Sequence, residues 1–227
     1  MIVELKDIFK SYSEGEDNPR RDILDSFNLS INFDESISIV GPSGCGKTTL
    51  LNILGTLDKP DSGEVVFNGE LVTNMNDDQL SKLRAEKIGF IFQSHHLLPQ
   101  ISVIENVILP TLAVNSKQNN TIIFDEAETL LSEVGLKNEV NKFPSQLSGG
   151  EKQRVAIVRS LINKPNLVLA DEPTGSLDKS RGEEIIDLLK SLCVNNQTSL
   201  VVVTHDIEIA SQMKRRLCFK NFDFIES

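Results

Sequence analysis

The sequence predicts an α/β fold with a parallel β-sheet core, an N-terminal antiparallel β lobe and an inserted helical segment. Three apolar runs, residues 37–40, 167–170 and 200–203, predict the core. Each is short, mostly β-branched and followed by a polar or glycine-rich turn, as in strands that are buried on both faces. Helical periodicity follows the first run over residues 47–55 and recurs over 182–192, which predicts repeated β-α units.

Short alternating segments within residues 1–33 predict the antiparallel lobe. A polar stretch, SEGEDNPRRD, separates two such segments. Alternation is typical of strands with one buried face. The alternating residues are Ile2, Glu4 and Lys6 against Val3 and Leu5, then Phe27, Leu29, Ile31 and Phe33 against Asn28 and Ser30.

The region between residues 93 and 165 predicts helices, because β-branched runs become sparse there. Residues 125–134 place Ala127, Leu130, Leu131 and Val134 at helical spacing. The polar stretch 115–121 is expected to be a surface loop, and a plain linker explains it equally well. We expect one domain over residues 1–227. Its core with the β lobe would be residues 1–93 and 165–227, and its helical subdomain residues 94–164.

The composition favours a globular protein that does not bind nucleic acid. Of 227 residues, 39% are hydrophobic and 25% charged, which suits one large domain or two small ones. With 33 acidic and 23 basic residues the net charge is −10, whereas phosphate backbones are bound by clustered Lys and Arg. Nucleic acid is therefore not an expected partner.

No membrane span, export signal or disulfide is expected. The longest apolar runs have about four residues, whereas a spanning helix needs roughly 20. The N-terminus, MIVELKDIFKSY, has acidic residues where a secretory signal has basic ones, so a cytosolic chain is expected. Cys45, Cys193 and Cys218 form no CxxC pair, which argues against disulfides and a zinc site.

Residues 41–48, GPSGCGKT, match the phosphate-loop pattern GxxxxGK[ST] between an apolar strand and a helix. Backbone amides of such a loop surround a phosphate, a lysine reaches the β- and γ-phosphates, and a hydroxyl ligates Mg²⁺. Cys45 inside the loop is either a redox sensor or merely a small tolerated side chain. The residues expected to contact nucleotide are Gly41, Pro42, Ser43, Gly44, Cys45, Gly46, Lys47, Thr48 and Thr49.

Polar side chains end three of the predicted strands, where open parallel sheets bind ligands. Asp171 and Glu172 end LVLADE, and they suit Mg²⁺ binding and polarisation of an attacking water, respectively. His205 follows the run 200–203 and is a candidate for a γ-phosphate hydrogen bond. Gln93 follows residues 88–92 and is a candidate ligand of the metal or water. Alone, His205 would be read as structural and the acidic pair as a solvated turn.

A second phosphate-binding helix start is predicted at LSGGE. Ser148 and Glu151 form a capping box, which by itself indicates only a well-capped helix. Gly149 and Gly150 leave the first amides bare of side chains, as anion-binding helix starts require. One γ-phosphate needs only one loop, so this site is spare unless it serves the nucleotide of a neighbouring chain.

Together these motifs resemble the ATP-binding cassette (ABC) family over essentially the whole chain. GPSGCGKT matches Walker A, LVLADE Walker B and LSGGE the signature; Gln93 matches the Q-loop residue, SLD (176–178) the D-loop and His205 the switch histidine. Tyr12 matches the aromatic residue that stacks on adenine. The resemblance implies ATP and Mg²⁺ as ligands. It also implies a RecA-like P-loop NTPase core with an N-terminal antiparallel β lobe and an inserted α-helical subdomain.

The resemblance further implies an assembly. Two cassettes would form a homodimer, closing head to tail around two ATP molecules, so that Ser148, Gly149 and Gly150 of each chain complete the partner's site. Two membrane permease subunits would be separate chains. The cassette would then lie on the cytoplasmic face of the bacterial inner membrane as a peripheral protein.

Within the family, two segments resemble the lipoprotein-releasing and macrolide-export group (LolD and MacB types). They are IFQSHHLLP (91–99) and ENVILP (105–110). The first expectation is release of lipoproteins or other amphiphiles. The alternatives are macrolide- or peptide-type export and an FtsE-like regulator of a membrane partner in cell-wall remodelling. A soluble ABC ATPase of translation or DNA repair is disfavoured, because it needs two cassettes or a long coiled-coil insertion.

Overall fold

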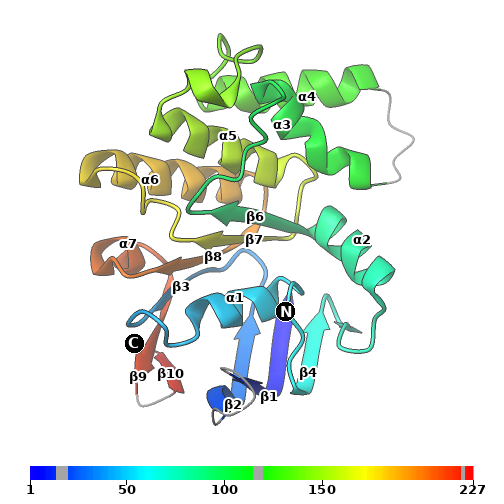
Figure 1. The fold of residues 1–227 in the computed structure, drawn as a ribbon, viewed down its shortest axis with the longest axis vertical. Coiled ribbons are helices and arrows are strands. Elements are labelled where there is room, and N and C mark those ends of the chain that lie inside the picture. Colours follow the sequence, from blue (N-terminus) through cyan, green and yellow to red (C-terminus); the bar gives the residue numbers. More distant parts are fainter. Residues whose placement is uncertain (14–19, 115–119, 221–222, 227) are drawn as a thin grey trace.

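Two β-sheets and several helices form the part of the chain that this computed structural model describes, residues 1–13, 20–114, 120–220 and 223–226 (Figure 1). The smaller sheet has the order β2-β1-β4-β5 and is antiparallel. Its strands are β1 (Val3–Tyr12), β2 (Arg21–Ile31), β4 (Ser62–Phe67) and β5 (Glu70–Leu71).

The larger sheet has the order β10-β9-β3-β8-β7-β6. All its pairings are parallel except that of β10 with β9. Its strands are β3 (Ser36–Val40), β6 (Ile88–Phe92), β7 (Leu167–Asp171), β8 (Ser199–Thr204), β9 (Arg215–Lys220) and β10 (Asp223–Glu226). The parallel core and the antiparallel lobe are therefore both confirmed.

Helices cover the larger sheet on both faces. Figure 1 shows α1 between the two sheets and α3, α4 and α5 beyond the opposite face of the larger one. The helices are α1 (Lys47–Leu54), α2 (Asp77–Lys87), α3 (Val103–Ile108), α4 (Asn120–Glu133), α5 (Gly149–Leu161), α6 (Lys179–Asn195) and α7 (Ile207–Ser211), with short 3₁₀ turns η1 (Leu109–Ala113) and η2 (Pro144–Gln146). No helix among the described residues is long and apolar enough to cross a membrane.

The larger sheet separates two hydrophobic clusters, because successive strand residues point to opposite faces. Leu169 and Val201 pack with α1 and the antiparallel lobe. Their neighbours Val168, Ala170 and Val202 pack with the helices of the other face. Burial on both faces explains why these strands have continuous apolar sequences.

Phe33 does not belong to a strand, contrary to the alternation. β2 ends at Ile31, and the Phe33 side chain is 53% exposed. Asp34 then turns the chain with a φ of 57°, a conformation that Asp tolerates better than most residues. The turn ends the strand, so Phe33, the next apolar residue of the alternation after Ile31, has no buried face of a sheet to occupy.

The predicted loop at 115–121 extends too far. Residues 115–119 lie outside the described residues, whereas Asn120 and Thr121 already belong to α4. The helix buries Ala127 and Leu131, as expected from their spacing. Its polar first residues hide its start from a periodicity argument.

Candidate nucleotide site

The segment between β3 and α1 forms a tight loop. Gly46 has a φ of 102°, and a Cβ there would lie 2.5 Å from Cγ2 of Ile23, so only glycine fits. Gly46 also caps α1 without a side-chain hydrogen bond. Within the described residues no side chain caps the first amides of α1, so their N–H groups can donate hydrogen bonds to an anion.

Lys47 is held inside this loop. Its Nζ donates to the carbonyl oxygens of Gly41 at 2.8 Å and Pro42 at 2.9 Å, and the residue is 9% exposed. A cation fixed beside unfilled amides suits phosphate binding. Cys45 is buried too, its Sγ only 2.7 Å from where a Cβ of Gly41 would lie. This burial favours the packing interpretation of Cys45, because oxidation needs exposure.

Asp171 meets the loop from the neighbouring part of the sheet. β3, β8 and β7 are adjacent and parallel, so their carboxyl ends share one edge. Thr48 Oγ1 donates to Asp171 Oδ2 at 3.3 Å. Burial raises the pKa of the Asp171 carboxyl above its usual range. A hydroxyl and a carboxylate in contact form a hard oxygen pair of the kind that Mg²⁺ binds.

Glu172 and His205 face each other at the same edge. His205 Nδ1 lies 2.9 Å from Glu172 Oε1, and Thr204 Oγ1 donates to Glu172 Oε2 at 3.3 Å. Glu172 has a φ of 46°, while its N–H still donates to Val203 O at 2.9 Å. Such left-handed backbone is costly for Glu and is found at functional sites more than elsewhere.

Gln93 lies one residue beyond β6, the strand that pairs with the strand ending at Asp171. Its strand neighbour Phe92 pairs with Asp171 across the sheet. The Gln93 side chain covers Gly175, where an added Cβ would lie 2.7 Å from Nε2. Gly175, which follows Glu172 in the chain, therefore contacts Gln93, where the segment leading into the helical region begins.

Tyr12 ends β1, and the residue is 41% exposed. Its hydroxyl donates to Asp58 Oδ2 at 2.6 Å. This contact joins the end of the antiparallel lobe to the segment that follows α1. An exposed, anchored ring of this kind is suited to stack on a flat ligand.

The second predicted phosphate site is not part of this cluster. Ser148 caps α5 and, with Glu151, forms the expected capping box; its Oγ and N donate to Glu151 Oε2 at 2.6 and 2.7 Å. No hydrogen bond of Ser148, within the described residues, reaches the phosphate loop. A Cβ on Gly150 would meet nothing within 4 Å, so this helix start is open.

The segment after Gln93 is fixed by contacts that no sequence pattern indicates. Asn106 is fully buried and brackets the turn: its Oδ1 accepts from Leu98 N at 2.8 Å, and its Nδ2 donates to Ser102 O at 2.9 Å. Arg159 of α5 donates to the carbonyl oxygens of His95 at 2.5 Å and His96 at 2.6 Å. His95 and His96 lie in HHLLP and Asn106 in ENVILP, but nothing local in either segment shows what these residues contact.

The comparisons with known proteins agree with this geometry. A family model described as ABC transporter matches residues 24–175. The chain belongs to the ABC transporter family. It is an ABC-type ATPase cassette, with the P-loop NTPase fold, antiparallel lobe and helices described above.

Two curated relatives of this cassette are named "Lipoprotein-releasing system ATP-binding protein LolD". The protein of Saccharophagus degradans is 45% identical over 215 residues, covering 94% of this chain and 92% of its own. The protein of Shewanella oneidensis is 43% identical over 221 residues, covering 97% and 94%.

Solved cassettes share the whole fold. The ATP-binding cassette MJ0796, in a dimeric post-hydrolysis state bound to ADP and Pi, superposes with a TM-score of 0.89 at 41% identity, covering 100% of this chain and 98% of its own. cbiO1 of Clostridium perfringens, part of the transporter complex cbiONQ, gives 0.86 at 28% identity, covering 99% and 86%.

Proposed function

We propose that this cassette hydrolyses MgATP as half of a head-to-tail homodimer and thereby drives separate membrane subunits that release lipoproteins from the bacterial inner membrane. The observation that carries the chemistry is the meeting of the phosphate loop, Asp171, Glu172 and His205 at one sheet edge. Sequence identity of 45% and 43% to the two LolD proteins, over nearly the full length of the chain, supports the cargo. The cassette would work at the cytoplasmic face of that membrane.

The proposed roles follow from the contacts. Lys47 and the free amides of α1 would bind the β- and γ-phosphates, and Tyr12 would stack on the adenine. Thr48, Asp171 and Gln93 would hold Mg²⁺, which neutralises charge on the phosphates when bound. Glu172 would accept the proton of the attacking water, and His205 would hydrogen-bond the γ-phosphate.

The open helix start at Ser148 suits completion of a partner's site. Ser148, Gly149 and Gly150 would supply amides to the γ-phosphate bound by the other chain. Dimeric structures of the similar cassette MJ0796 support such a pairing. The phosphate loop of each chain would then be incomplete without the second chain.

Ser148→Arg is expected to leave ATP binding to the monomer nearly normal but eliminate turnover, because the large cation fills the helix start. Mixing it with Lys47→Ala protein should restore part of the turnover through one intact composite site. ATP affinity and steady-state hydrolysis measure the two effects. Failure of every mixing ratio to restore hydrolysis would contradict shared sites.

Ser102→Arg is the matched control for Ser148→Arg. Ser102 caps α3 with the same capping box, its Oγ and N donating to Glu105 Oε2 at 2.6 and 2.7 Å. Both variants lose a cap worth about 1 kcal/mol of folding stability. Only the variant at the signature should lose hydrolysis.

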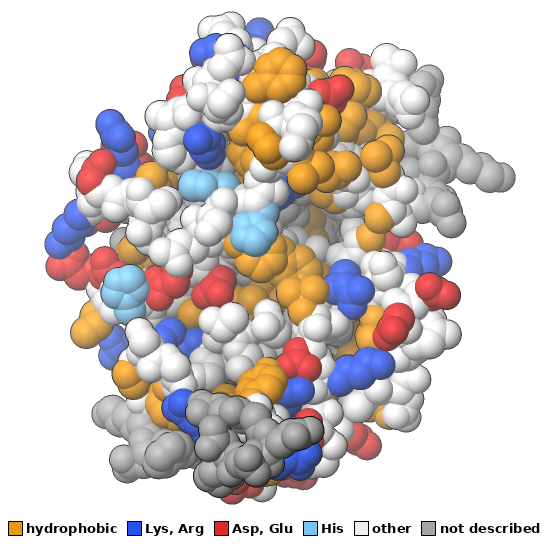
Figure 2. Space-filling model, viewed as in Figure 1, with side chains coloured by type: hydrophobic (Ala, Val, Ile, Leu, Met, Phe, Trp, Pro, Cys, Tyr) orange, Lys and Arg blue, Asp and Glu red, His pale blue; other side chains and the backbone are white. Residues whose placement is uncertain are grey.

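A groove beside β6 suits docking of the membrane subunits. Its volume is about 450 Å³, and α2, η1 and α5 border it. Figure 2 shows hydrophobic side chains in the middle of this face and over its helical end. The apolar and aromatic lining residues are Leu57, Ala85, Ile88, Phe90, Phe92, Pro110, Ala113 and Pro165. An apolar groove next to Gln93 would couple a membrane partner to the nucleotide site.

The residues after Gln93 differ in how well they test this docking. Leu97 packs against the helical core and His95 is half-buried, so changing either would disturb the fold as well as a partner. Leu98 is 43% exposed and Leu57, in the groove, 48%. The exposed pair is therefore the better test.

Leu57→Asp and Leu98→Asp are expected to abolish co-purification with the permease while sparing basal ATP hydrolysis, because neither side chain contacts the nucleotide site. Val194→Asp, an exposed apolar residue of α6 outside the groove, is the control and should co-purify normally. The proposed cargo needs a second measurement, the release of lipoproteins by the assembled complex. Full complex formation by both the Leu57 and the Leu98 variant would move the interface elsewhere.

A further inference from the structure

Tyr12 is anchored through its hydroxyl rather than left as a free surface ring. Asp58 Oδ2 accepts from the phenol at 2.6 Å. The other oxygen, Asp58 Oδ1, accepts from Lys10 Nζ and from the backbone N–H of Lys59, both at 2.8 Å. One carboxylate thus joins the ring to a cation and to the chain beyond α1.

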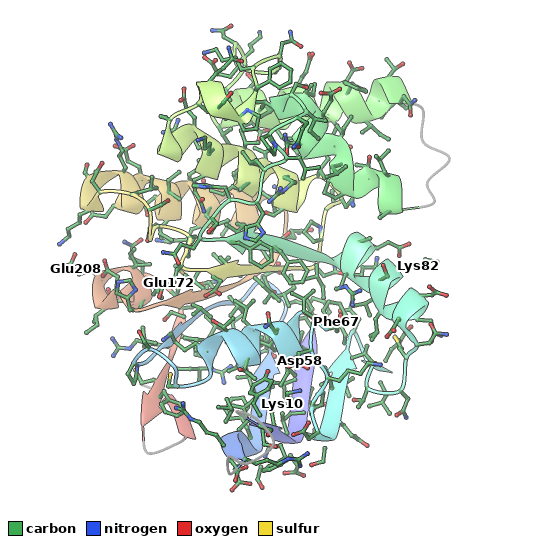
Figure 3. The ribbon with its side chains drawn as sticks, viewed as in Figure 1. Lys10, Asp58, Phe67, Lys82, Glu172 and Glu208 are labelled. Carbon is green, nitrogen blue, oxygen red and sulfur yellow. The ribbon has the colours of Figure 1, made fainter. Side chains whose placement is uncertain are left out.

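Lys10 makes this anchor rigid because it is itself buried. It is 7% exposed, and its Nζ also donates to the carbonyl oxygen of Lys59 at 2.7 Å. The ammonium lies 5.1 Å from the centroid of the Tyr12 ring, within the range of a cation–π contact. A buried ammonium group is costly without a partner, so the hydrogen bond from Lys10 to Asp58 is strongly favoured and holds Asp58 in place. Figure 3 labels Lys10 and Asp58 where the end of β1 meets the segment after α1.

The anchor is continuous with the helix that begins at the phosphate loop. The N–H groups of Leu57 and Asp58 donate to Asn52 O at 2.8 and 3.2 Å, which ties the segment to the last turn of α1. Further along, Asp61 Oδ2 accepts from Ser11 N at 2.9 Å. The ring and the phosphate loop are therefore attached to the two ends of one short helix.

We propose that Asp58, held by Lys10, is a positioning residue that fixes the Tyr12 ring at the place where the base of a purine nucleotide stacks. The inference rests on the proposed nucleotide role of Tyr12. We call the contact between Asp58 and the Tyr12 hydroxyl the lock. Stacking accepts any flat base, so the lock sets the affinity for the base and leaves the phosphate chemistry unchanged. Loss of the lock should raise KM without lowering kcat, as removal of uniform binding does.

Tyr12 is the only tyrosine in the chain, which contains no tryptophan, so tyrosine absorbance reports on this ring alone. Burial and the Asp58 hydrogen bond raise the pKa of Tyr12, whereas the Thr49 side chain in the first turn of α1 lowers it. Without nucleotide, Asp58→Asn should lower the tyrosine pKa in an ultraviolet titration. Asp61→Asn, the same change beside Ser11, should not. An unchanged pKa of Tyr12 in Asp58→Asn would disprove the lock, whatever effect the substitution has on ATP affinity.

ATP binding then tests the purpose of the lock. Asp58→Asn and Tyr12→Phe, which keeps the Lys10–Asp58 pair, should each weaken ATP binding about 3- to 10-fold, the usual worth of one hydrogen bond. The double variant should be no weaker than either single one, whereas independent effects would multiply. Multiplied effects would overturn the inference.

Inorganic tripolyphosphate separates this inference from the proposed function. It has no base, so Asp58→Asn should leave its affinity unchanged; a parallel loss would mean that the substitution damages the phosphate loop and would overturn the positioning role. Tyr12→Ala supplies the other arm. Unchanged ATP affinity in that variant would refute base stacking by Tyr12, even where the tyrosine titration had confirmed the contact with Asp58.

Discussion

Lys47→Ala is expected to abolish nucleotide binding while the fold stays intact. Lys47 is the cation of the phosphate loop, and its Nζ is held by the carbonyl oxygens of Gly41 and Pro42 inside the loop that we propose binds the β- and γ-phosphates. Each charge-assisted hydrogen bond is worth about 1.5–3 kcal/mol, so loss of two should weaken ATP roughly 100-fold or more. Calorimetric titration of the purified chain with ATP measures this.

Lys82→Ala controls for the loss of one positive charge. Lys82 lies on α2 with a side chain 71% exposed, and Figure 3 places it on the opposite side of the molecule from Glu172. Its only expected cost is a surface ion pair with Glu86, worth about 0.3–0.5 kcal/mol. ATP affinity that is unchanged in Lys47→Ala would remove the phosphate-loop assignment.

The parts of this molecule that sequence predicts are those whose determinants are local. Strand runs that are buried on both faces, such as residues 200–203, show in composition alone. The capping box joins Ser148 and Glu151, which are three positions apart, and the sequence predicts it. Parallel pairing of β3, β8 and β7 then brings their polar ends together, so the edge that carries Asp171 and His205 follows from topology.

The unpredicted parts depend on contacts between distant residues. Tyr12 and Asp58 are 46 positions apart, and Arg159 and His96 are 63 apart. Arg159 binds backbone carbonyls, which every residue has, so its partner leaves no mark in the sequence. Asn106 is similar, because the four hydrogen bonds that its side chain makes within the described residues all reach main-chain atoms. Periodicity and motifs cannot reveal such contacts.

Glu172→Gln is expected to trap a stable ATP-bound dimer. Lys47, Thr48 and Asp171 are unaltered, so nucleotide and metal should still bind. The amide has nearly the size of the carboxylate and can keep contacts to Thr204 and His205. It cannot accept the proton of the attacking water, however, so general-base help worth about 10²–10⁴ in rate is lost.

The expected dimer follows because each ATP would lie between the phosphate loop of one chain and Ser148 of the other, so that slow hydrolysis means slow opening. Size-exclusion chromatography with MgATP should show a dimer for Glu172→Gln and mainly monomer for the wild type. Glu208→Gln, a carboxylate of α7 with a side chain 64% exposed, is the matched control and should behave as wild type. Hydrolysis at the wild-type rate in Glu172→Gln would show that Glu172 is not the base. A variant that binds ATP yet stays monomeric would instead contradict a dimer that closes without the membrane subunits.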